Sequence, residues 1–142
     1  MKSFMVTARE YNELRKGTWV GELGIEIVAV EPGRLLARIK VRKELLSPNG
    51  FLHAASIVAF ADSLCGSGTM ENLPANARGY VTIELKTNLL GTAREGILEC
   101  EATLAHAGRT TQVWDARVTA VGSGKPIALF RCTQLIVYEA NP

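Results

Sequence analysis

The sequence is poor in aromatic residues and in groups of side chains that bind metals. Phenylalanine, tryptophan and tyrosine make up 6% of the 142 residues, so nothing indicates an aromatic cage around a ligand. The three cysteines, Cys65, Cys100 and Cys132, stand far apart, and neither histidine lies within a few residues of one. No pair has the spacing of a metal site. We expect no metal, and we expect buried, reduced thiols, because free cysteine behaves as a small hydrophobic residue.

A surplus of charge and a long apolar run are lacking too. The 16 basic and 14 acidic residues give a net charge of +2, which offers no argument for nucleic acid or an anionic membrane as a partner. No apolar run approaches the roughly 20 residues that cross a bilayer. The opening MKSFMVTARE also lacks the apolar core of a signal peptide. We therefore expect a cytoplasmic protein without a membrane or nucleic-acid partner.

The length and the unbroken pattern predict a single domain over residues 1–142. One domain usually takes roughly 100–200 residues, and no repeat, low-complexity tract or Pro/Gly-rich linker divides this chain. A hydrophobic content of 47% and a charged content of 21% are typical of a globular protein.

Strand-like alternation flanks one long apolar segment. Thr7–Lys16 predicts a short helix, because a Thr cap is followed three residues later by Glu10. In Leu23–Val30 the odd-numbered residues should share one face. Period-two alternation predicts six strands, over Leu23–Val30, Arg34–Arg42, Tyr80–Leu90, Ile97–His106, Thr111–Val121 and Ile127–Tyr138. Six strands with one substantial helix indicate an α+β protein, with one sheet curved over the helix.

The long apolar segment, from about His53 to Thr69, predicts that helix. Its apolar stripe consists of Ile57, Phe60, Ala61 and Leu64, and the opposite side is only weakly polar. A helix that is apolar nearly all round is buried. The sheet is therefore expected to wrap it.

One acidic residue, Asp62, lies in the middle of this helix. Its neighbours three and four residues away are Val58, Ala59, Cys65 and Gly66, none of which can pair with a carboxylate. A carboxylate in such surroundings has a raised pKa and is typical of a functional site. The alternative is a structural pair with an Arg or Lys of another strand.

His53 begins the helix, after the turn Ser47-Pro48-Asn49-Gly50. A helix start presents unpaired N–H groups that suit an oxygen gaining negative charge. An ordinary capping or core histidine is the alternative. Nine residues, or about two and a half turns, separate His53 from Asp62, so the two lie on opposite sides of the helix. One site in one subunit cannot readily use both, whereas two copies meeting in a dimer can.

The segment Ser47–Gly68, SPNGFLHAASIVAFADSLCGSG, resembles the signature of hot-dog-fold thioesterases of the phenylacetic-acid-degradation type. That signature is Gly-x-x-His ahead of a helix, with Asp or Glu nine residues after the His. The resemblance continues through VTIELKTNLL, AHAGRTTQ and ALFRCTQLIVY, over most of the chain. It implies a hot-dog fold: a curved antiparallel six-stranded sheet wrapped around one long central helix, with a short N-terminal helix.

The resemblance also implies a reaction, the hydrolysis of an acyl-CoA thioester to a free acid and CoA. No cofactor is implied, since coenzyme A enters as part of the substrate. In such enzymes the N–H after the His, here Ala54, holds the carbonyl, and the carboxylate, here Asp62, comes from the partner subunit. The carboxylate acts as general base or as nucleophile. A hydroxyl on the following strand positions the water, and Thr82 occupies that place.

Further contacts to coenzyme A are implied for four residues: Ser47, Gly50, Asn88 and Arg109. Arg109 stands in the His-x-Gly-Arg turn, where related proteins touch the phosphates. The sequence departs from the family twice. His-Gly-Gly reads His53-Ala54-Ala55, whose methyls narrow the approach to the helix end. The Asn or Gln six residues before the His is Ser47, and Asn49 is the candidate substitute.

Two other functions stay open. An acyl-CoA hydratase typically reads Asp-x-x-x-x-His, or His followed by Phe-Pro, and neither string occurs. A non-catalytic acyl-CoA-binding or sensing module does not need an unpaired carboxylate. The sequence does not identify the acyl group. The expected assembly is a homodimer as the minimal unit, paired into a homotetramer, because free sheet edges favour association.

Overall fold

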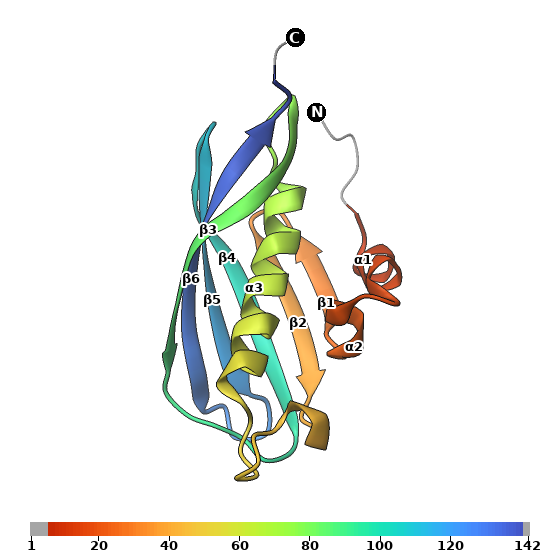
Figure 1. Cartoon of the computed structure of the whole chain (residues 1–142), viewed down its shortest axis with the longest axis vertical. Helices are drawn as coiled ribbons and strands as arrows, with labels where there is room; N and C mark the ends of the chain where they lie inside the picture. The colour runs from red at the N-terminus through yellow and green to blue at the C-terminus, as the bar shows by residue number, and fades with distance from the viewer. Residues whose placement is uncertain (1–5, 141–142) are drawn as a thin grey trace.

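Six antiparallel strands form one sheet in the computed structural model, which describes residues 6–140 (Figure 1). The opening residues 1–5, on which the signal-peptide argument partly rests, lie outside this range. In spatial order the strands are β1 (Glu26–Glu31), β2 (Arg34–Lys40), β4 (Ile97–Ala107), β5 (Thr111–Ala120), β6 (Pro126–Tyr138) and β3 (Ala77–Leu89). The two edges of the sheet are therefore β1 and β3.

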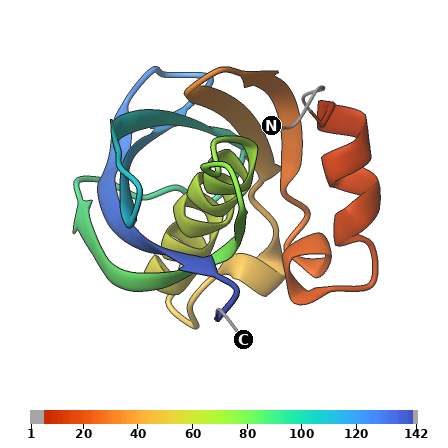
Figure 2. The same cartoon turned by 90° about the horizontal axis from the view of Figure 1, so that it is seen from above.

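The helix α3 (Ala54–Glu71) runs inside the curve of the sheet (Figure 2). Its apolar residues pack against the inward-facing residues of the strands, and Phe60, Ala61 and Leu64 are fully or almost fully buried. The fold predicted from the sequence is thus confirmed. The helix begins after His53, as expected, and ends two residues later than predicted.

Two glycines let the end of α3 approach its neighbours closely. A Cβ on Gly68 would lie 2.6 Å from the ring of Trp114, and a Cβ on Gly66 would lie 2.2 Å from the Tyr80 hydroxyl. Neither distance is compatible with van der Waals contact. Gly66 therefore allows Tyr80, from the edge strand β3, to reach the helix one turn after Asp62.

The predicted first strand differs from the one that forms. A β-bulge between Ile27 and Ala29 moves Val30 onto the core, opposite Leu35, so Ala29 does not share the face of Ile27 as expected. Leu23 is buried as expected but precedes the strand, because it caps the short helix α2 (Trp19–Glu22). A helix of four residues has no periodicity to predict it. A 3₁₀ turn, η1 (Lys43–Leu45), was likewise not expected.

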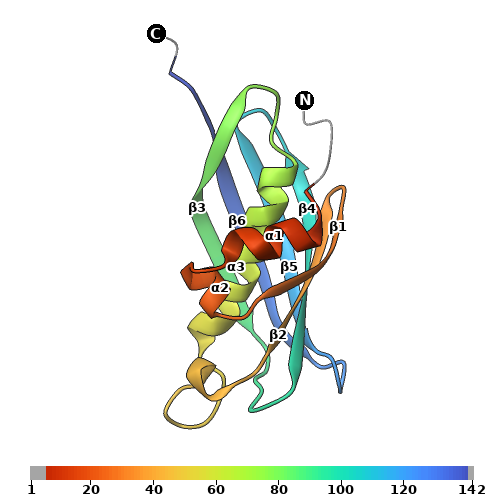
Figure 3. The same ribbon diagram turned by 90° about the vertical axis from the view of Figure 1, so that its right-hand side faces the viewer.

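The N-terminal helix α1 (Ala8–Arg15) crosses the open side of α3 (Figure 3). The predicted capping box between Thr7 and Glu10 is present. Tyr11 donates a hydrogen bond from its hydroxyl to Glu71 Oε1 at 2.6 Å. The Asn12 side chain donates to the Ile27 carbonyl at 3.0 Å and accepts from the Ile27 N–H at 2.9 Å, so it completes the free edge of β1. Side chains of α1 thus join α3 to the sheet.

The other edge strand, β3, is exposed on both of its faces. Its apolar residues include Val81, Ile83 (56% exposed), Leu85 and Leu89. An exposed, apolar edge strand is a template for association with another strand. Within residues 6–140 no helix is long and apolar enough to cross a bilayer.

Candidate active site

Asp62 lies on the stretch of α3 that the sheet leaves half open. Its Oδ1 is buried and has no hydrogen-bond partner, and no Lys or Arg among residues 6–140 forms an ion pair with it. The alternative of a structural pair with a strand cation is therefore wrong for the isolated subunit. Burial raises the pKa of the Asp62 carboxyl above its ordinary value. The result is a carboxylate that is available as a proton acceptor.

A cavity of about 410 Å³ opens beside Asp62. Its walls come from α1, α2 and α3 and, through Tyr80, from β3. Burial raises the pKa of Tyr80, and the nearby charge of Asp62 adds to this effect. The Tyr80 hydroxyl therefore stays protonated and can donate a hydrogen bond at neutral pH.

His53 caps the start of α3. Its Nδ1 accepts a hydrogen bond from the Ala55 N–H at 3.0 Å, so the hydrogen of the neutral ring is on Nε2. The Ala54 N–H finds no acceptor among the described residues, and Ala54 is exposed. A free N–H at a helix start is the donor that a developing oxyanion needs. It is the N–H to which the resemblance assigns the carbonyl of the substrate.

His53 and Asp62 line different cavities. The one at His53 measures about 320 Å³ and is bounded by Trp19 of α2 and by residues around η1. The one at Asp62 lies farther along α3, between the helix and α1. The two side chains thus occupy separate sites within one subunit, as the spacing of nine residues predicts.

The loop before α3 is held by its own backbone and by one side chain. The Ser47 N–H donates to the Phe51 carbonyl at 2.7 Å, and the Gly50 N–H donates to the Ser47 carbonyl at 2.9 Å. Gly50 has a φ of 85°, which favours glycine. Asn49 Oδ1 accepts from the Phe51 N–H at 3.1 Å, so its amide nitrogen is the part left to meet a ligand.

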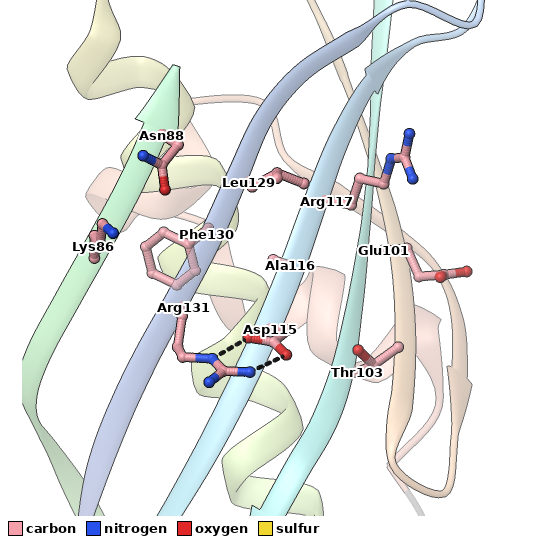
Figure 4. Close-up of a pocket in the computed structure, with 10 residues that line it drawn as sticks. All are labelled: Lys86, Asn88, Glu101, Thr103, Asp115, Ala116, Arg117, Leu129, Phe130 and Arg131. Carbon is pink, nitrogen blue, oxygen red and sulfur yellow. Dashed lines mark hydrogen bonds and ion pairs between the residues drawn. The ribbon is translucent and has the colours of Figure 1, made fainter. Parts of the chain in front are cut away.

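Thr82 and Asn88 fall on opposite faces of β3. Thr82 pairs with the buried Gln134 and therefore faces α3. A bulge between Thr82 and Glu84 then reverses the alternation, and Asn88, opposite Leu129, lies on the outer face of the sheet. Figure 4 shows Asn88 there, at the rim of a shallow cavity of about 570 Å³ that faces away from α3. One subunit does not bring Asn88 to Asp62.

Arg109 stands in the turn between β4 and β5, at the end of the sheet that lies beside the C-terminal end of α3 (Figure 1). Its carbonyl accepts a hydrogen bond from the Tyr138 hydroxyl, and its side chain is exposed. The Gln112 side chain fixes the neighbouring helix end by donating to the Asn72 carbonyl at 2.7 Å. Arg109 is thus far from His53 within one subunit.

Sequence reasoning missed the residues of α1 and β3 that complete the cavity at Asp62, above all Arg15 and Tyr80. Small residues at Ser63, Gly66 and Ser67 on α3 were the only sign that other side chains approach the helix there. The three cysteines are free and buried, as expected. Across residues 6–140 no three His, Cys, Asp or Glu side chains gather as metal ligands would.

Comparison with known proteins identifies the family of the chain. The model of the family described as "Thioesterase superfamily" matches residues 49–127. The 1,4-dihydroxy-2-naphthoyl-CoA hydrolase of Listeria monocytogenes is 29% identical over 111 residues, which are 78% of this chain and 89% of that protein. The crystal structure of a mutant of thioesterase PA1618 from Pseudomonas aeruginosa has a TM-score of 0.89 and 29% identity, covering 95% of this chain and 96% of that one.

The resemblance to the phenylacetic-acid-degradation type is also found in structure. The PaaI protein of Escherichia coli, from the phenylacetic acid degradation operon, has a TM-score of 0.78 at 20% identity and covers 89% of both chains, which shows the shared fold. The matched segment 49–127 contains the free N–H at the helix start, the buried carboxylate and the edge strand. The chain belongs to the thioesterase superfamily, and thioester hydrolysis is the chemistry that this membership supports.

Proposed function

We propose that the chain hydrolyses acyl-CoA thioesters to the free acid and CoA, at a site shared by two subunits. The observation that carries the proposal is the unpaired carboxylate of Asp62 at the wall of a cavity. Burial without a partner is costly for a carboxylate, so a structural role gives no reason to keep it. Its raised pKa also makes it a stronger base than an exposed aspartate.

In the proposed reaction Asp62 takes a proton from water, and the water oxygen attacks the thioester carbonyl. The carbonyl oxygen gains negative charge and accepts a hydrogen bond from the Ala54 N–H of the other subunit. The C–S bond then breaks, and the proton that Asp62 took from water passes to the sulfur, so that CoA leaves as the thiol. Attack by Asp62 itself, followed by hydrolysis of the resulting anhydride, gives the same products. Thr82, which faces α3, is the candidate to orient the water.

A homodimer is part of the proposal because the two halves of the site face different cavities in one subunit. The apolar β3 edge supports it, since pairing of this edge with a second copy would bury Val81, Ile83 and Leu85. Pairing of dimers into a homotetramer is the further step. Asn88, on the outer face of the sheet, and Arg109, in the turn between β4 and β5, are the proposed contacts to CoA from neighbouring subunits.

The test is release of free thiol from a panel of aliphatic and aromatic acyl-CoAs by the wild type and by Asp62→Asn. Loss of a general base lowers kcat by about 10²–10⁴. Glu13→Gln is the control, because Glu13 is an exposed carboxylate that pairs with Lys16 at 2.8 Å and does not line the cavity at Asp62. A turnover above about a third of wild type in Asp62→Asn would contradict the assignment, given the range expected for a base.

A further inference from the structure

Arg15, the last residue of α1, is a largely buried cation without an anion. Its Nη2 donates to Ser67 Oγ at 2.6 Å and to the Ser63 carbonyl at 3.3 Å. Its Nη1 is buried and has no acceptor. Among residues 6–140 no carboxylate forms an ion pair with it, although burial lowers the pKa of the guanidinium. The group stays charged, because arginine is not deprotonated in proteins.

The neighbouring basic residues of α1 behave differently. Lys16 is exposed and pairs with Glu13 at 2.8 Å, and Arg9 is exposed on the outer side of the helix. A basic residue in the last turn favours the helix dipole, but that benefit requires no burial. Hydrogen bonds to neutral serine oxygens do not neutralise a buried charge. Fastening α1 to α3 therefore does not account for a guanidinium with a free buried N–H.

Arg15 lines the cavity that contains Asp62. Arg15 and Asp62 both line this space of about 410 Å³, together with Tyr80 and the apolar side chains of Leu14 and Met70. Ser67, which holds Arg15, comes five residues after Asp62 in α3, about 7 Å farther along the helix axis. The two residues that Arg15 contacts, Ser63 and Ser67, thus lie within about one and a half turns of Asp62 along α3.

We propose that Arg15 binds an oxygen at the far end of the acyl group. The preferred substrates are then acyl-CoAs whose acyl group carries a distal hydroxyl or carboxylate. This rests on the proposed function, since it takes the reacting carbonyl to lie at Asp62. An acyl group without such an oxygen would remove water from the accessible part of Arg15 without replacing its hydrogen bonds. A site built to hydrogen-bond a substrate discriminates strongly against the analogue that lacks the bonding group.

The experiment compares two matched pairs of substrates by thiol release. Benzoyl-CoA against 4-hydroxybenzoyl-CoA tests a hydroxyl, and hexanoyl-CoA against adipoyl-CoA tests a carboxylate. For the wild type we expect kcat/KM to favour the oxygen-bearing member of at least one pair by about 10-fold or more. In Arg15→Met that ratio should fall by about 10- to 100-fold, because one charge-assisted hydrogen bond is lost. Arg15→Lys keeps the charge and should keep part of the preference.

Two controls separate recognition from the fastening of α1. Arg9→Met removes an exposed arginine from the same helix and should leave the ratio unchanged. Asn12→Ala breaks the two hydrogen bonds to Ile27 and loosens α1 without touching Arg15. A structural effect changes both members of a pair alike, whereas recognition changes their ratio.

Calorimetry of acyl-CoA binding to the Asp62→Asn protein tests the role of Arg15 without requiring turnover. If no acyl-CoA is hydrolysed by the wild type, the proposed function fails, and the ratio of Kd values within each pair still decides the role of Arg15. Equal kcat/KM and equal Kd within both pairs would overturn the inference. So would an Arg15→Met protein that keeps the ratio but dissociates into monomers, because a partner subunit would then be what Arg15 binds.

Discussion

Adding one methyl group at either of two glycines of α3 should have unequal consequences for stability. Alanine in place of glycine inside a helix contributes about 1 kcal/mol through the lower entropy of the unfolded chain and better helix propensity. Gly66 and Gly68 stand two residues apart in the same helix, so this gain is the same for both. The difference must come from what the new methyl meets.

At Gly68 the methyl meets the ring of Trp114, with three ring atoms between 2.6 and 2.9 Å. The indole is fully buried, and its Nε1 donates to Gln112 Oε1 at 2.8 Å, so the ring cannot move aside. Overpacking of this kind costs about 1–3 kcal/mol. With a rigid obstacle we take the upper end and expect Gly68→Ala to lose about 2 kcal/mol net. That corresponds to a Tm about 4–8 °C lower for a domain of this size.

At Gly66 the methyl meets the Tyr80 hydroxyl at 2.2 Å, with the ring carbon behind it at 3.2 Å. This is the far end of a half-buried side chain beside a cavity, so it can turn away. We expect the stability of Gly66→Ala to stay within about 1 kcal/mol of wild type, while kcat/KM falls because Tyr80 turns into the cavity at Asp62. Urea unfolding of both variants gives the free energies. Equal changes in stability at the two positions would refute the reasoning.

Three further predictions concern Asp62 and the edge strand. Because burial raises the folded-state pKa of Asp62, the folded chain binds more protons than the unfolded chain above the ordinary aspartate pKa, and stability falls as pH rises through that window. Asp62→Asn should therefore raise the Tm at neutral pH, with the gain disappearing at acid pH; a lower Tm at neutral pH would contradict this. Co-expression of His53→Ala with Asp62→Ala subunits should restore activity to about a quarter of wild type, since half of randomly formed dimers are mixed and each has one complete site; no recovery in purified heterodimers would argue against a shared site. Ile83→Lys places a charge on the exposed β3 edge, so light scattering should detect monomers that keep the far-UV circular dichroism of the wild type; an intact dimer would rule out pairing through this edge.

Periodicity predicted the strands well where pairing is regular. Leu35, Ala37, Ile39 and Val41 are buried as their alternation requires. Periodicity failed at the β-bulges. A bulge inserts one extra residue relative to the partner strand, and the alternation within a single strand does not show where this happens. By strict alternation Thr82 and Asn88 would share a face, and the bulge after Thr82 separates them. The same effect removed Ala29 from the predicted core face.

The sequence predicted only the part of the site that lies on the single helix α3. The spacing of His53 and Asp62 fixes their relative direction, because both belong to α3 and a helix has a fixed period. The remainder of the cavity comes from contacts between distant segments. Arg15 is separated from Ser67 by more than fifty residues, and nothing in α1 shows that its last residue turns inward. A helix pattern gives the face of a residue but not the neighbour that the face will meet.

One wall of the cavity at Asp62 comes from α1, which lies far from Asp62 in the sequence. The family match begins at residue 49, after α1 has ended at Arg15, and the helix is attached to the rest of the molecule largely through single side chains such as Tyr11 and Asn12. If Arg15 binds the acyl group as proposed, substitutions in α1 would alter which acyl group is accepted without changing Asp62 or the start of α3. Exchange of this short segment between relatives is accordingly a compact route by which new specificities can arise, in nature or by recombination in the laboratory.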